Sequence, residues 1–184
     1  MKKINWSNVT ESCGQPTKDG YICKIIAIDD DEQNEYLKVY LDIAEGAYAG
    51  YFQDLYDRYG FYGLTHIRSY KDTAKGLFKK FLSILEKSNQ GFVADAFDND
   101  PQKLLNLQIG AVLQLRRYTK NNGLDGTQLR VAEVCTTGDI LANNFKVPDD
   151  LDERKNIQIA TVTPKADYGF VNVNADSEEG LPFK

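Results

Sequence analysis

The stretch that decides the fold is EYLKVYLDI, Glu35 to Ile43. Polar or aromatic residues alternate strictly with aliphatic residues in this stretch, which is typical of a half-buried β-strand, because successive side chains of a strand point to opposite faces. Along the chain, one face carries Tyr36, Lys38, Tyr40 and Asp42, and the opposite face carries Leu37, Val39, Leu41 and Ile43. The apolar face predicts a core packed against this strand, and the polar face is left for solvent or for a ligand.

Two stretches next to this strand predict further strands. GYICKIIAID, Gly20 to Asp29, is β-branched and largely apolar, which is typical of a strand buried on one or both faces. The acidic run from Asp29 to Asn34 is interpreted as a hairpin connection. After the second strand, Gly46 to Tyr56 is expected to form a third strand entered through a glycine turn. Residues 57–68 are then expected to be an irregular connection rich in aromatic and basic side chains.

A helix is predicted from Ser69 to Asn89, because apolar residues recur there at helical spacing. Ser69 and Asp72 have the spacing of a capping box, with Asp in place of Glu, and Gly91 follows the expected end. The apolar positions are Leu77, Phe78, Phe81, Leu82 and Leu85. This is the one long helix that the sequence indicates.

A second hairpin is predicted after the helix. Gln108 to Tyr118 alternates again, and Gln128 to Val134 can pair with it across the Gly- and Asn-rich connection KNNGLDG at 120–126. The resulting order is three strands, a helix and two strands. It predicts a mainly β fold, a five-stranded OB-type barrel with one helix between strands three and four.

The chain divides into four predicted parts. Residues 1–19 form an N-terminal extension, 20–138 the barrel domain, 139–175 a C-terminal extension and 176–184 a flexible acidic tail. The net charge is −5, yet its distribution is uneven. Residues 58–130 hold 12 Lys and Arg against six acids, whereas from Asp139 onward nine acids face five bases. Such asymmetry indicates a basic working surface and an acidic end.

Several classes of protein are disfavoured by the composition. No apolar run approaches the roughly 18–20 residues of a membrane helix, and the first 14 residues lack the apolar stretch of a signal peptide. Three widely spaced cysteines fit neither a disulfide framework nor a zinc site. His66 is the only histidine, and no P-loop or GxGxxG element is present. We therefore expect a cytoplasmic protein that is not an enzyme and uses no cofactor or metal.

Aromatic and basic residues interleave in the segment of positive balance. Binding of a single strand without sequence preference needs cations along a groove for phosphates and aromatic faces for unstacked bases. The predicted contact residues are Tyr36, Lys38, Tyr40, Arg58, Tyr62, Arg68, Arg116, Tyr118, Lys120 and Arg130, and the connection at 57–70 adds Tyr59, Phe61, His66 and Tyr70. The alternative is that the rings are ordinary sheet packing and the bases only solvate it.

The chain ends in ADSEEGLPFK, Ala175 to Lys184. Acids followed by Leu-Pro-Phe resemble the C-terminal tip of bacterial-type single-stranded DNA-binding proteins, and the stretch from Asp42 to Gly46, followed by Phe52, is similar to phage-encoded members of that group. The resemblance implies that the tip recruits replication and repair proteins. The residues that would do so are Asp176, Glu178, Glu179, Leu181, Pro182 and Phe183. One departure is Lys184, which places the terminal carboxylate one residue beyond Phe183.

Three functional hypotheses follow. The first is a single-stranded DNA-binding protein of phage replication or recombination, which self-associates because one barrel offers a short site. The second is a protein-interaction module on the same barrel that acts through its acidic LPF tail. The third is a small metal-dependent nuclease that uses Asp29 to Glu32 together with Asp42, although these acids are more simply a solvated hairpin.

Overall fold

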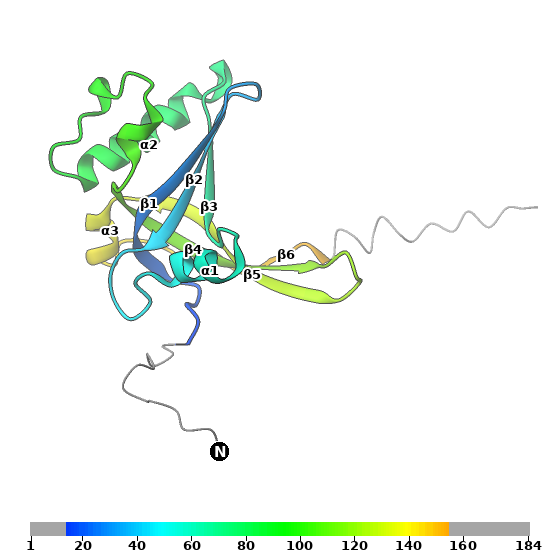
Figure 1. The fold of residues 1–184 in the computed structure, drawn as a ribbon. Coiled ribbons are helices and arrows are strands. Elements are labelled where there is room, and N and C mark those ends of the chain that lie inside the picture. Colours follow the sequence, from blue (N-terminus) through cyan, green and yellow to red (C-terminus); the bar gives the residue numbers. More distant parts are fainter. Residues whose placement is uncertain (1–13, 155–184) are drawn as a thin grey trace, which may run out of the picture. The chain divides into compact units, whose positions relative to one another are not determined.

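The computed structural model describes residues 14–154 of the 184-residue chain, and the predicted tail at 176–184, with its six partner-binding residues, lies outside them. The described elements form a mainly β fold (Figure 1). The strands are β1 (Gly20–Asp31), β2 (Tyr36–Ile43), β3 (Thr65–Ser69), β4 (Gln108–Thr119), β5 (Asp125–Cys135) and β6 (Leu151–Asp152). The helices are α1 (Tyr51–Tyr59), α2 (Lys75–Ser88) and α3 (Thr137–Leu141), with short 3-10 turns η2 (Asp72–Ala74), η3 (Ala94–Ala96) and η4 (Pro101–Leu104).

The strands form one sheet in the order β3-β2-β1-β4-β5, in which each neighbouring pair is antiparallel. The short strand β6 adds to β4 in parallel, opposite Arg116 and Arg117. Helix α2 lies in the chain between β3 and β4. β3 approaches β5, but no hydrogen-bonded ladder joins these two strands among the residues that the structure describes.

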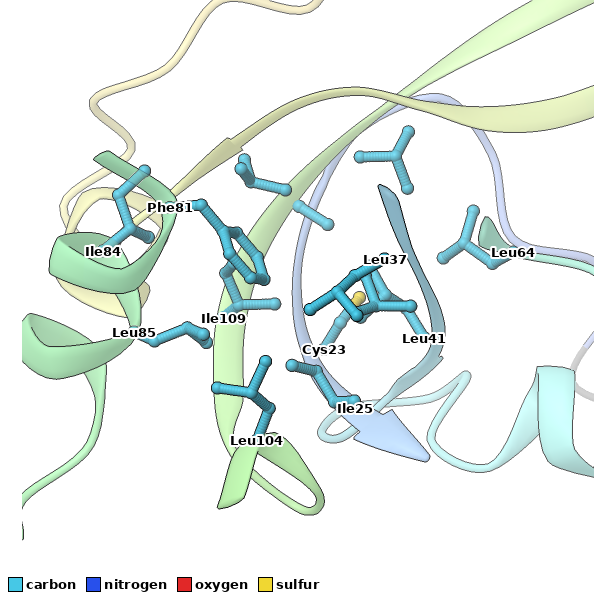
Figure 2. Close-up of a cluster of buried hydrophobic side chains, with 14 of the residues drawn as sticks. Cys23, Ile25, Leu37, Leu41, Leu64, Phe81, Ile84, Leu85, Leu104 and Ile109 are labelled. Atoms are coloured by element: carbon cyan, nitrogen blue, oxygen red, sulfur yellow. The ribbon is translucent and has the colours of Figure 1, made fainter. Parts of the chain in front are cut away.

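The core confirms the apolar face predicted for β2, because Leu37, Val39, Leu41 and Ile43 are all buried. The face predicted to be open is half-buried only at Tyr36 and Lys38, and Tyr40 and Asp42 are buried as well. Side chains from α2 point into the same cluster as those of β1 and β4 (Figure 2). The labelled residues in that view include Phe81, Ile84 and Leu85 from α2, Cys23 and Ile25 from β1, and Ile109 from β4. This apolar cluster fixes β2 with its opposite face directed away from the core.

The third strand predicted at Gly46 to Tyr56 is wrong. This region forms a loop and then α1, which is bounded by two glycines in the left-handed conformation, Gly50 with φ 80° and Gly60 with φ 73°. A residue with a Cβ would be strained at either position, so the glycines mark both ends of the helix. The third strand is instead β3, within the segment expected to be irregular.

The capping box predicted at Ser69 and Asp72 is also wrong. Ser69 ends β3, where its hydroxyl donates a hydrogen bond of 3.1 Å to the carbonyl of Glu35, and Asp72 forms an ion pair of 2.5 Å with Lys75. Helix α2 therefore begins later than predicted, at Lys75. Its predicted end is confirmed, because Asn89 is the C-cap.

The predicted second hairpin is confirmed as β4 and β5, with β5 beginning at Asp125 rather than Gln128. The first hairpin is longer than predicted, because β1 continues past Asp29 through Asp30 and Asp31, which were expected in the turn. The described fold continues past Gly138 through α3 and β6. None of the helices within residues 14–154 is long and apolar enough to span a membrane.

Candidate nucleic-acid interface

The candidate residues fall into two groups. We call the outer face of β2 and β3, together with the rings of α1 and the α1–β3 connection, the sheet half. We call the far part of the β4–β5 hairpin, from Gln114 to Arg130, the hairpin half. Figure 1 shows this hairpin extending beyond the other strands of the sheet, with β6 beside it.

In the sheet half, Tyr40 is covered by other rings. Its ring centroid lies 4.2 Å from that of Tyr62, which in turn stacks on Tyr56 at 4.1 Å with an interplanar angle of 9°. Lys38 Nζ lies 5.0 Å from the Tyr40 ring centroid. Tyr40 is only 7% exposed, whereas Tyr36 and Lys38 are half-buried. Tyr40 and Tyr62 therefore hold α1 and its connection against β2, and Tyr56 presents the outermost ring of the stack.

The buried hydroxyl of Tyr40 donates a hydrogen bond to the carboxylate of Asp29 on β1. Burial and this hydrogen bond both raise the pKa of the Tyr40 phenol. A second carboxylate, that of Asp42, is buried and accepts a 3.0 Å hydrogen bond from the backbone N–H of Phe52. The polar face of β2 is thus tied to β1 at one strand position and to α1 at another.

The exposed rings of the sheet half lie at the end of α1. Tyr59 is 67% exposed and Phe61 is 54% exposed, and their rings stack with centroids 6.2 Å apart. Ile67 on β3 is also 54% exposed and lies opposite Lys38 in the β2–β3 register. Because a stacking platform must be open to solvent, these side chains are better placed than Tyr40 to meet a base.

Two predicted arginines occupy different environments. Arg58 is exposed on α1 and forms an ion pair of 3.6 Å with Asp54 one helical turn away. Arg68 lies opposite Leu37 in the register, on the core-facing side of β3, with its guanidinium 6.0 Å from the Phe81 ring centroid. Burial lowers the pKa of Arg68. The structure therefore separates Arg68 from the outer face that carries Lys38.

The hairpin half brings three of the predicted residues onto one face. Arg116 and Tyr118 are two positions apart on β4, and Arg130 lies opposite Gln114 in the β4–β5 register. Side chains two apart on a strand, or directly opposite across a ladder, share a face. The Arg116 guanidinium lies 5.2 Å from the Tyr118 ring centroid, and Arg130 is exposed.

Lys120 lies beside this group because of a glycine. A Cβ placed on Gly126 would come within 2.9 Å of Lys120 Cε and 3.0 Å of Tyr118 Cζ, so both side chains lie over that glycine. Gly126 is buried although it belongs to an otherwise exposed stretch of β5. Its small size lets the aromatic ring and the ammonium group lie side by side near the end of the hairpin.

A cleft of about 410 Å³ joins the two halves where β3 faces β5. Thr65, His66 and Ile67 line it from β3, and Arg116, Gln128, Leu129, Arg130 and Val131 line it from the hairpin, and Gly63 and Glu153 complete the lining. The two arginines thereby meet the exposed apolar side chain of Ile67 across the open side of the sheet. The sequence did not indicate Ile67, Gln128 or Glu153, because nothing in the residue pattern showed that β3 and β5 face each other.

His66 lies in this cleft as a buried neutral group. Only 8% of its surface is exposed, and burial, followed by the charge of Arg68, lowers the pKa of His66 to about 3. Its Nε2 has no hydrogen-bond partner among the described residues. A histidine held neutral over the working pH range adds no charge for a phosphate, so His66 shapes the cleft wall.

The remaining reactive side chains do not gather at one point. Asp29 and Asp31 lie on the face of β1 opposite to Asp30, as alternation requires, and no group of three His, Cys, Asp or Glu side chains within residues 14–154 could hold a metal ion. Burial raises the pKa of the Cys135 thiol to about 11, and that of Cys23 is raised further. Neither thiol is a thiolate nucleophile near neutral pH.

No protein-family model matches the chain, and no curated protein matches it significantly.

Proposed function

We propose that this protein binds single-stranded DNA without strong sequence preference, on an interface that runs from the rings of the sheet half, across the cleft, to the bases of the hairpin half. The observation that carries the proposal is the cleft itself, which brings Arg116 and Arg130 together with Ile67. The exposed rings of Tyr59 and Phe61, which precede the cleft residue Gly63 in the chain, and the Arg116–Tyr118 pair of the hairpin would supply the two contacts that single-strand binding needs, base stacking and phosphate neutralisation.

The fold that we propose is a five-stranded OB-type barrel. The strand order β3-β2-β1-β4-β5, with α2 between β3 and β4, is the order that such a barrel requires, and the remaining opening lies between β3 and β5. In this architecture the outer side of the second and third strands, with the adjoining loops, binds oligonucleotides. The cleft lies next to these strands, which supports the same assignment.

The biological role that we propose is the coating of DNA during phage replication or recombination in the host cytoplasm. Binding would be non-catalytic, and several copies would associate along one strand. Residues 176–184 would recruit replication or recombination proteins through Leu181, Pro182 and Phe183. This part of the proposal is supported by the sequence resemblance of the tail.

The test is a titration of dT oligomers of increasing length at two salt concentrations, followed by intrinsic tyrosine and tryptophan fluorescence. We expect affinity to rise with length until the site is filled and to fall steeply with salt, by a slope of about 0.7 per phosphate contact. Arg116→Gln combined with Arg130→Gln should lower both affinity and slope. The matched control is Lys80→Gln combined with Lys87→Gln, which removes the same charge from exposed positions of α2.

Two outcomes would overturn the proposal. One is an absence of salt-dependent binding by the wild-type protein. The other is an equal loss of affinity in the two double variants, because that would show a response to net charge and not to the cleft.

A further inference from the structure

The acidic segment around β6 lies against the hairpin half. Four of the five residues from 149 to 153 are acids, and β6 pairs with β4 opposite Arg116 and Arg117. The backbone N–H of Glu153 donates a 3.0 Å hydrogen bond to the carbonyl of Arg117, which extends this short ladder. A segment of the C-terminal extension thus reaches two arginines of the hairpin.

The segment is held on one side of β4. Asp150 forms ion pairs with Lys18 at 2.6 Å and with Arg117 at 3.0 Å, and Arg154 forms one with Asp125 at 2.7 Å. Consecutive residues of a strand point to opposite faces, so Arg117 is directed away from the face that carries Arg116. These contacts attach the segment without using the candidate interface.

Glu153 lies on the other side, inside the interface. Its carboxylate accepts hydrogen bonds from Arg116 Nε at 2.9 Å and from Arg116 Nη2 at 2.6 Å, and it lines the cleft beside Arg130. The hydrogen bond from Arg116 lowers the pKa of Glu153, and the nearby charge of Arg130 acts in the same direction. The carboxylate is therefore negative at the point where two cations of the cleft meet.

We propose that Glu153 occupies a phosphate site formed by Arg116 and Arg130, and that single-stranded DNA must displace its carboxylate to bind there. The inference rests on the proposed function. A guanidinium presents the same fork of N–H donors to a carboxylate and to a phosphate, so one can replace the other. The Arg116 and Glu153 side chains are 35% and 33% exposed, and an ion pair with that access to water is weak enough for a polyanion to replace.

Displacement has a consequence for selectivity. A DNA strand that fills the whole interface makes several phosphate contacts and can replace one carboxylate, whereas an isolated anion competes with a partner that is tethered to the site. Glu153 would thus lower affinity for short or isolated anions more than for a strand that crosses the cleft.

The first test compares Glu153→Gln with wild type in the dT titration. We expect up to about fivefold tighter binding with a salt slope close to that of wild type, because the same phosphate contact forms without first breaking the Arg116–Glu153 ion pair. The matched control is Glu86→Gln on α2, which removes the same charge, and its amide oxygen can still accept the hydrogen bond from the Ala94 N–H.

The second test follows the wild-type chain directly, so it holds even if the variant folds poorly. The carboxyl 13C chemical shift of Glu153, followed with pH, reports the pKa that its hydrogen bond from Arg116 lowers, and adding saturating dT oligomer should raise that pKa toward its ordinary value. If wild type binds but the Glu153 and Glu86 variants do not differ, or if the pKa of Glu153 stays the same when DNA is bound, the displacement is overturned and the proposed function stands. A failure of both wild type and Glu153→Gln to bind would overturn the two together.

Discussion

The sheet half and the hairpin half contain the same kinds of residue, alternating tyrosines and bases on an outward strand face, but the structure uses them differently. In the sheet half, Tyr40 is covered by Tyr62 and its hydroxyl is bound by Asp29. In the hairpin half, Tyr118 is half-buried and its neighbour Arg116 contacts Glu153, the acid that directly follows β6. The residue pattern therefore indicates which side chains share a face, and the packing over that face decides whether they are free to bind a ligand or stabilise the fold.

The difference assigns separate roles to rings that look equivalent in sequence. A ring that is enclosed by other rings contributes to stability, and one that is open to solvent can contribute to binding. Tyr40 and Tyr118 are the clearest pair, because each lies beside a cation on its own strand. The predictions that follow test whether this division is real.

The largest effect is expected for Tyr40→Ala. Removing a ring that is 7% exposed should lower the free energy of unfolding by about 3 kcal/mol, since the cavity would lie under Tyr62 and α1. Denaturant unfolding measures the loss. The matched variant Tyr118→Ala should cost less than about 1 kcal/mol, because its main described contact is a cation–π pair at 5.2 Å. Equal losses in the two variants would contradict the division.

A smaller effect is expected from acid, through His66 where the two halves meet. Its pKa is about 3 in the folded chain and 6.5 as the ordinary value. As pH falls below 6.5, the unfolded chain binds a proton that the folded chain does not, so stability falls by roughly 1.4 kcal/mol per pH unit until about pH 3. Between pH 8 and pH 5 the free energy of unfolding should drop by about 2 kcal/mol.

The control for this pH dependence is His66→Gln, which cannot take up the proton. The difference in unfolding free energy between wild type and the variant should change by that amount over the same pH interval, while contributions from the acids cancel. A constant difference from pH 8 to pH 5 would show that His66 is accessible to water in solution.

The third effect concerns binding, and it returns to Tyr118. If this ring stacks on a base, Tyr118→Ala should weaken dT binding by about 1–2 kcal/mol while the salt slope stays the same. Arg130→Gln should instead change the salt dependence, lowering the slope of log affinity against log salt by about 0.7. Binding by Tyr118→Ala that equals wild type would move the stacking role to Tyr59 and Phe61, at the other end of the interface.

The strands that could be predicted are those whose residues reveal their surroundings. The alternation in β2 followed directly from its contact with the core, and the Gly- and Asn-rich turn between β4 and β5 has a local conformational cause. Helix α1 was missed although Phe52, Leu55 and Tyr59 have helical spacing between two glycines, because the many aromatic residues also favoured a strand. The short strand β3 then had no place in the predicted order.

The candidate site was less predictable because it depends on long-range contacts. Arg116, Tyr118 and Arg130 could be grouped from the hairpin alone, and the register confirms that they share a face. Arg68 was assigned to the same surface, yet it lies on the core-facing side of β3, since that strand was not recognised. Glu153 was invisible to local patterns, because its contact with Arg116 joins residues far apart in the chain.

The smallest effect on stability is expected for deletion of residues 176–184. Every buried hydrophobic residue of the described chain lies between Ile22 and Val134, so the deletion removes no part of that core, and the free energy of unfolding should change by less than about 0.5 kcal/mol. The deleted segment carries Asp176, Glu178 and Glu179. Their negative charge should compete weakly with DNA for the basic cleft, so affinity for dT should rise modestly at low salt and converge with wild type at higher salt.

Combining this deletion with Glu153→Gln sharpens the comparison between an acid that is hydrogen-bonded in the cleft and acids that act only through charge. If the two act independently, their effects on binding free energy should add, and only the Glu153 effect should survive at high salt. The control replaces Asp176 by Asn, Glu178 and Glu179 by Gln and Lys184 by Gln at full chain length, which removes the same net charge as the deletion, and it should match the deletion in DNA affinity. A large loss of thermal stability in the deletion but not in this control would mean that Leu181, Pro182 and Phe183 pack against the fold, and the recruitment role would then be untenable.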